Sequence, residues 1–73
     1  MAFINHYVKT QALRDAMIEK EVYSHHELQI RTDLSKSVIT DLFNWPEKPK
    51  RLKTCLAVCK ALGKNMNELF ETR

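Results

Sequence analysis

Residues 25–44, HHELQIRTDLSKSVITDLFN, contain two short helical patterns with a tight turn between them. Four apolar residues of the second pattern are spaced i, i+1, i+4 and i+5, so they share one side of a helix, which must be buried. The opposite side carries polar side chains of kinds that reach base edges when a helix lies in the DNA major groove. The apolar set is Val38, Ile39, Leu42 and Phe43, and the polar set is Lys36, Ser37, Thr40, Asp41 and Asn44.

Capping signals mark the ends of these two helices. Ser24 and Glu27 are spaced as a capping box, in which the serine oxygen accepts from a backbone N–H and the glutamate reaches back. Asp33 suits the turn, because Asp tolerates the left-handed backbone conformation better than most residues. Ser35 is the expected N-cap of the second helix. Together these signals predict a helix-turn-helix over about residues 24–45.

The segment before this unit is predicted to be helical from about His6 to Lys20. Asn5 is the expected N-cap, and Thr10 is the alternative cap of a shorter helix. In the connection that follows, Val22 and Tyr23 are expected to pack inward. The apolar stripe of this helix is Val8, Ala12, Leu13, Ala16 and Met17.

Two more helices are predicted after the helix-turn-helix. One runs from about Arg51 to Leu62 and stops at Gly63, a residue that favours helix ends. A short final helix begins at Asn65, which is spaced to form a second capping box with Glu68. The apolar seam of the longer helix is Leu52, Cys55, Leu56, Cys59 and Leu62, and the buried face of the short helix is Met66, Leu69 and Phe70.

Length and composition favour one small all-α domain over residues 1–73. The chain has 73 residues, of which 44% are hydrophobic, and this is enough for one core. One Gly and two Pro are few for a β-sandwich or barrel, so we expect a compact bundle of about five short helices. Cys55 and Cys59 lie four residues apart on one helix and are expected to pack in the core as free thiols. We therefore expect no metal and no cofactor.

Several classes of protein are disfavoured by what the sequence does not contain. No apolar run is long enough to span a bilayer and no signal peptide is present, which predicts a cytoplasmic protein in a bacterial cell or a phage-infected host, without membrane contact. The sequence has no Gly-rich phosphate loop, nucleophile elbow or helical His pair with a glutamate, so an enzyme is not expected. A chain this short leaves no room for a ligand-sensing domain, and no small-molecule ligand is expected.

Positive charge is concentrated just after the polar helix. The net charge is +3, yet residues 1–31 carry four basic and four acidic side chains and are balanced. The excess lies at Lys48, Lys50, Arg51 and Lys53. We interpret Lys48, Lys50 and Arg51 as contacts to DNA phosphates, and the alternative is a solvated loop that keeps the protein soluble.

Four segments of this chain match a known family. Residues 13–15 (LRD), 24–28 (SHHEL), 34–39 (LSKSVI) and above all 61–70 (ALGKNMNELF) resemble the lambda-repressor-like helix-turn-helix superfamily of phage Cro proteins, phage repressors and bacterial XRE-type regulators. The resemblance spans residues 13–70. Residues 28–42 also resemble the DNA-reading unit of winged-helix regulators, but that fold needs a β-hairpin wing where this chain is predicted to be helical.

The resemblance implies roles for individual residues. The start of the first helix of the pair would sit on a phosphate, and the N-terminal half of the second would enter the major groove. His25 matches the family's phosphate-contacting glutamine, and Ser24 and Ser35 are the accompanying backbone contacts. The family's base-contacting positions correspond to Lys36, Ser37 and Thr40.

Three nearby residues allow two interpretations each. Asn44 either pairs with adenine or ends the helix. Asp41 either accepts from cytosine N4 or forms a salt bridge with a neighbouring lysine, and the salt bridge is favoured. Trp45 is expected to pack in the core or against its loop, with a DNA sugar or a dimer partner as alternatives.

These expectations combine into two functional hypotheses. The first is a sequence-specific regulator that binds double-stranded DNA, a phage or prophage Cro-like repressor that acts as a homodimer by occupying its operator. Met66 and Phe70 are its expected dimer contacts, by analogy with the family. The second is a protein-interaction module of the same fold, such as an antitoxin, an anti-repressor or an inhibitor, with partner contacts expected at Tyr7, Trp45 or Phe70.

Overall fold

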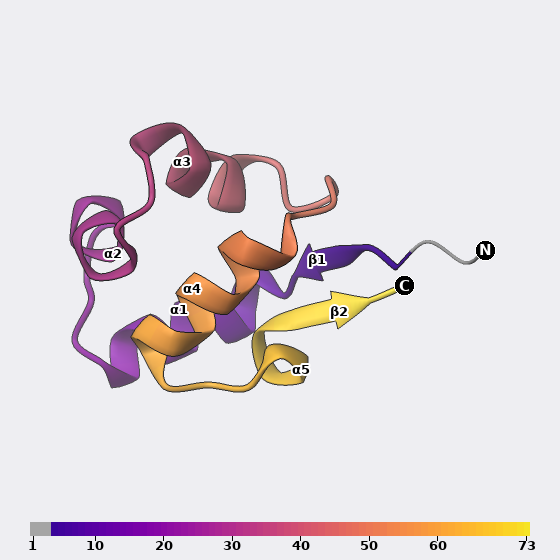
Figure 1. Cartoon of the computed structure of the whole chain (residues 1–73). Helices are drawn as coiled ribbons and strands as arrows, with labels where there is room; N and C mark the ends of the chain where they lie inside the picture. The colour runs from indigo at the N-terminus through magenta and orange to yellow at the C-terminus, as the bar shows by residue number, and fades with distance from the viewer. Residues whose placement is uncertain (1–3) are drawn as a thin grey trace.

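The computed structural model describes residues 4–73 and contains five helices and a pair of short strands, shown in Figure 1. An all-α fold is confirmed, and the strand pair is a small addition to it. None of the helices in this part of the chain is long and apolar enough to cross a membrane. In chain order the elements are β1 (His6–Val8), α1 (Thr10–Glu19), α2 (His25–Thr32), α3 (Lys36–Asn44), α4 (Leu52–Leu62), α5 (Met66–Leu69) and β2 (Phe70–Thr72).

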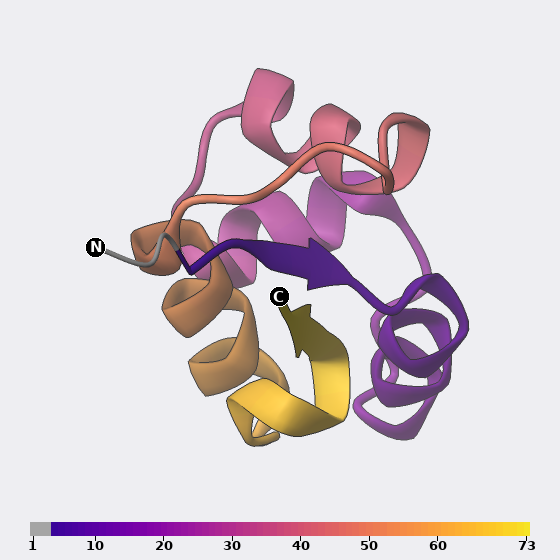
Figure 2. The same ribbon diagram turned by 90° about the vertical axis from the view of Figure 1, so that its right-hand side faces the viewer.

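The strand pair joins the two ends of the described chain. β1 and β2 are antiparallel, and Val8 lies opposite Phe70 in their register. The prediction that a helix begins near His6 is therefore wrong, because the backbone of these residues pairs with a segment more than sixty positions away. α1 begins only at Thr10, with Lys9 as its N-cap, and neither Asn5 nor Thr10 is the cap. Figure 2 shows the two strands between α1 and α4.

One hydrophobic core joins all the helices and both strands. α1 supplies Leu13, and the largest buried side chain, Phe70, comes from β2. Leu28 of α2 and Leu42 of α3 are both fully buried, so the helix-turn-helix is fixed to this core from each of its helices. The other buried apolar residues are Val8, Ala16, Met17, Val22, Ile39, Cys55, Val58, Cys59, Leu62 and Leu69.

Some predictions about buried faces are wrong. In α4 the buried side is rotated toward Val58, which leaves Leu52 53% exposed and Leu56 51% exposed. Tyr23 is 71% exposed, whereas its neighbour Val22 is buried as expected. Phe70 is buried as expected in the core, so the accompanying hypothesis that its side chain is exposed is wrong.

The two cysteines are buried free thiols, as predicted. Burial raises the pKa of Cys55 to about 11, and the charge of a neighbouring Cys59 thiolate contributes to this rise. Burial likewise raises the pKa of Cys59, whose Sγ lies 3.8 Å from Sδ of Met66. Both side chains therefore remain neutral thiols at neutral pH and act as small core residues.

The turn of the helix-turn-helix gives a test of local strain. Asp33 has φ 58° in the left-handed region, where a Cβ atom is unfavourable and Gly is not. We expect Asp33→Gly to raise the free energy of unfolding by about 0.5–1 kcal/mol, measured by urea titration followed by circular dichroism. Asp33→Ala is the matched control and should lower it. A glycine variant less stable than the wild type would contradict this account of the turn.

Candidate nucleic-acid interface

The polar face of α3 points away from the core. At about 100° per residue, Ser37 and Asn44 lie opposite Ile39 and Leu42, which are buried at 2% and 0% exposure. Lys36, Ser37, Asp41 and Asn44 are exposed and Thr40 is half-buried. All five predicted base-reading side chains therefore lie on the solvent side of one helix, and a partner that approaches α3 meets them first.

Two serine caps fix the starts of α2 and α3. The Oγ of Ser24 accepts from the backbone N–H of Glu27 at 3.1 Å, which is the serine half of the predicted capping box. The Oγ of Ser35 accepts from the N–H of Val38 at 3.3 Å. Because these hydroxyls occupy the third N–H group of each helix, the first N–H groups point outward from an electropositive helix end, where a phosphate is favoured.

A buried threonine stabilises the turn between these helices. The Oγ1 of Thr32 donates to the carbonyl of Leu28 at 2.7 Å. The same oxygen accepts from the backbone N–H of Leu34 at 3.4 Å. The N–H of Asp33 also donates to the carbonyl of Gln29 at 2.9 Å. These bonds close the end of α2 and set the direction in which the chain enters α3.

His25 forms a contact between the two helices that the sequence pattern did not reveal. Its ring stacks on Phe43 of α3 with 4.0 Å between the centroids and an angle of 12° between the planes. His25 itself is exposed at the first position of α2. The stack orients the imidazole beside the helix N-terminus and covers part of the half-buried Phe43 ring.

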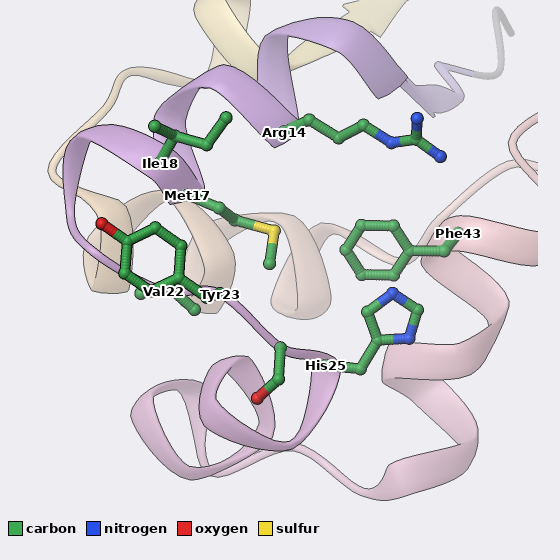
Figure 3. A pocket seen from close by; sticks show the side chains of 8 residues that line it. Arg14, Met17, Ile18, Val22, Tyr23, His25 and Phe43 are labelled. Carbon is green, nitrogen blue, oxygen red and sulfur yellow. The ribbon is translucent and has the colours of Figure 1, made fainter.

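Arg14 lies beside the start of α2, and the sequence analysis did not single it out as a candidate site residue. It extends from α1 toward Phe43, and it lines the same hollow of about 360 Å³ as His25 (Figure 3). Met17, Val22 and Tyr23 also line this hollow, which opens at the start of α2. Residue spacing could not identify Arg14, because α1 is distant in sequence from α2 and α3 and only the tertiary fold brings it beside them.

The loop between α3 and α4, residues 45–51, is called the basic loop here, and its lysines are of two kinds. Lys50 is half-buried, and its Nζ donates to the carbonyls of Asp41 at 3.1 Å and Trp45 at 2.6 Å. It therefore caps the C-terminal end of α3, where a cation is favoured. Burial lowers the pKa of Lys50, and the charges of Asp41 and Glu47 oppose that effect. Two of the three N–H groups of this ammonium therefore bond within the protein, and its predicted role as a phosphate contact stays a prediction.

The remaining basic residues of this cluster are accessible. Lys48, Arg51 and Lys53 are exposed, and all three line a groove of about 480 Å³ that also reaches Val38 and Asp41 of α3. Nζ of Lys48 lies 5.0 Å from the centre of the Trp45 ring, a cation–π contact. Trp45 is 47% exposed, so it packs against its own loop and not in the core.

The favoured interpretation of Asp41 as a salt-bridge partner is wrong for the described residues, because its carboxylate forms no salt bridge there. Lys50 donates to the backbone carbonyl of Asp41 and not to its side chain.

Comparison with known proteins agrees with this geometry. A family model described as the Cro/C1-type HTH DNA-binding domain matches residues 12–73. The chain therefore belongs to this family of DNA-binding domains, as its resemblance to lambda-repressor-like proteins implied. Neither a curated protein nor a solved structure matches the chain. The match covers most of α1 and all of α2 to α5 and β2, so it includes every residue of the candidate interface described above.

The two kinds of lysine can be separated by substitution. Lys50→Met removes the cap of α3, and we expect it to lower the free energy of unfolding by about 1 kcal/mol. Lys48→Met should leave stability within about 0.5 kcal/mol of the wild type, because this lysine is exposed. Thermal or urea unfolding of both variants tests this difference. Equal stability of the two variants would remove the capping role from Lys50.

Proposed function

We propose that this protein is a sequence-specific transcriptional regulator, a Cro-like repressor that occupies its operator as a homodimer in the cytoplasm of a bacterial cell or phage-infected host. The observation that carries the proposal is the exposed polar face of α3, on a helix whose opposite side buries Ile39 and Leu42 in the core. Membership of a DNA-binding family supports DNA as the partner of that face. Because a dimer of such domains reads two half-sites about one helical turn apart, its operator would be two-fold symmetric.

Base reading is assigned to the solvent side of α3. Lys36 would donate to guanine O6 or N7, and Ser37 and Thr40 would contact base edges near the start of the helix. Asn44 lies on the same side as Ser37 and would pair with adenine. Asp41 is exposed beside them, and its carboxylate would accept from cytosine N4 and disfavour other bases at that position.

Phosphate contacts are assigned to both sides of α3. Ser24, His25 and Ser35 would hold phosphates at the starts of α2 and α3. We add Arg14, which lines the same hollow as His25 and Phe43 (Figure 3). Lys48 and Arg51 would hold the backbone on the other side through the loop before α4. These contacts are independent of sequence and set the orientation in which α3 meets the bases.

A protein partner is the second candidate function. The observation in its favour is the hollow lined by Met17, Ile18, Val22 and Tyr23, whose rim residues Ile18 and Tyr23 are 60% and 71% exposed. An apolar side chain of an antitoxin or anti-repressor target would fit there. This candidate makes no use of the polar face of α3, so substitutions on that face separate the two functions.

Selection from a random-sequence duplex pool tests the proposed function directly. We expect recovery of a two-fold symmetric motif, with affinity that falls as salt rises because phosphate contacts release counterions. Arg14→Met and Lys48→Met should each reduce the slope of log affinity against log salt by about one, while the recovered motif stays the same. Weak binding with no motif would exclude operator recognition and favour the protein-partner function.

Substitutions on α3 test how the motif is read. Ser37→Ala and Asn44→Ala should each weaken binding to the selected site by about 1–3 kcal/mol and relax preference at one base position per half-site. Lys60→Ala is the control, because Lys60 is exposed on α4 and outside the proposed interface. Titrations by fluorescence anisotropy with matched and mismatched duplexes give the measurement. Equal loss on both duplexes would show that these residues contact only the backbone.

A further inference from the structure

His25 is the residue of the candidate interface whose charge can change near neutral pH. An imidazole passes from cationic to neutral between about pH 5 and pH 8, whereas lysine and arginine side chains stay cationic in that range. The chain has three histidines, at positions 6, 25 and 26. Of these, His25 lines the hollow at the start of α2, and the other two do not.

The ring of His25 is held in one orientation by Phe43. The two rings stack with 4.0 Å between their centroids and 12° between their planes. Phe43 is half-buried and belongs to α3, so the stack fixes the imidazole relative to both helices of the helix-turn-helix. A stacked ring covers one face and leaves its nitrogen atoms at the edge. Because His25 is exposed, that edge is accessible to an acceptor from outside the chain.

The charged groups around this ring are mainly positive. Arg14 of α1 lines the same hollow, and Lys36 lies about two turns before the stacked ring on the same side of α3. The ring also lies at the electropositive end of α2. The nearby carboxylate is that of Glu27, and within residues 4–73 no carboxylate forms a salt bridge with His25. Tyr23 is the remaining titratable side chain that lines the hollow.

A DNA phosphate at the start of α2 would supply the negative charge that the chain does not place beside this ring. A protonated imidazole has two N–H donors and forms a charge-assisted hydrogen bond with a phosphate oxygen, whereas the neutral ring has one donor and no charge. The complex would therefore bind more protons than the free protein. By linkage, affinity then falls as pH rises through the range in which an imidazole loses its charge.

We propose that His25 binds a DNA phosphate as a protonated imidazolium held by the stack on Phe43, so that DNA binding takes up a proton and operator occupancy falls as pH rises. This inference rests on the proposed function for DNA as the partner, and it adds a means of regulation. The change of charge is confined to a backbone contact. The affinity for every sequence therefore changes alike, and the recognised motif stays the same at each pH.

Fluorescence anisotropy titrations at constant salt and varied pH test the proposal. We expect the affinity of the wild type for a selected duplex to fall roughly tenfold between about pH 6 and pH 8. His25→Gln keeps a hydrogen-bonding side chain without a charge that responds to pH, so its affinity should change less than about twofold over that range. Circular dichroism of this exposed-site variant checks the fold. A wild-type affinity that does not change with pH overturns the proposal.

The other two histidines provide matched controls. His26 follows His25 on α2 and is exposed, and the ring of His6 bonds to the side chain of Thr72 on the strand pair. We expect His26→Gln and His6→Gln each to keep the pH dependence of the wild type. If either control loses this dependence while His25→Gln retains it, another residue takes up the proton and the proposal is overturned.

Calorimetry in two buffers of different ionisation enthalpy counts the protons directly. Near pH 7 we expect the wild type to take up protons on binding, up to about one per protomer, and His25→Gln to take up none. Phe43→Leu removes the stack but keeps an apolar side chain, so it should lower the uptake while circular dichroism shows a retained fold. Uptake equal to that of the wild type in Phe43→Leu would overturn the role of the stack.

The pH dependence and the operator function can fail separately. Because a phosphate contact is independent of sequence, the titrations are repeated at low salt with a duplex of unrelated sequence. A recovered motif bound with an affinity that does not change with pH overturns the role of His25 and leaves the proposed function in place. Binding of the unrelated duplex that depends on pH and on His25, without any recovered motif, supports the contact and overturns operator recognition. Absence of DNA binding at every pH overturns both.

Discussion

The pairing of β1 with β2 is the constraint on which the orientation of α3 depends. β1 bonds to β2 on one side, and on the other its His6 carbonyl accepts from the N–H of Lys50 at 2.6 Å. The same Lys50 caps the C-terminal end of α3 through its ammonium. The ends of the chain, the basic loop and α3 are thus joined by one continuous set of hydrogen bonds. A change in the strand pair would therefore be transmitted to α3, although the two lie far apart in sequence.

α3 also depends on its surroundings because it is short. A helix of nine residues is only marginally stable by itself in water, and α2 has eight. The serine caps satisfy N–H groups at the start of each, Asp33 turns the chain between them, and Lys50 satisfies carbonyls at the end of α3. Burial of Leu28 and Leu42 in the core supplies the rest of the stability of these two helices. The residues of the polar face are therefore under little constraint from folding, because few of them are needed to hold α3 in place.

The parts of the fold that could be predicted from sequence are those set by local interactions. The caps at Ser24 and Ser35, the left-handed Asp33 and Gly63, and the capping box of Asn65 with Glu68 all depend on residues within a few positions, and all are present. β1 could not be predicted in this way, because its partner lies at the other end of the chain. The rotation of α4 that exposes Leu52 and Leu56 was missed for a similar reason. Its buried side is set by where α2 and α5 pack, and the apolar spacing alone fits more than one rotation.

In the candidate interface, too, some residues could be predicted from local spacing and others only from the tertiary fold. The polar face of α3 follows from helical spacing, so its residues could be identified before the fold was known. The stack of His25 on Phe43, the position of Arg14 and the capping role of Lys50 required three dimensions. These three residues share one property, which is that each connects two elements. The residues of the polar face can be identified by their spacing within α3, whereas residues that position this helix are defined by the second element they touch. Of the basic residues beside α3, Lys50 belongs to the second group, because its ammonium caps the end of that helix.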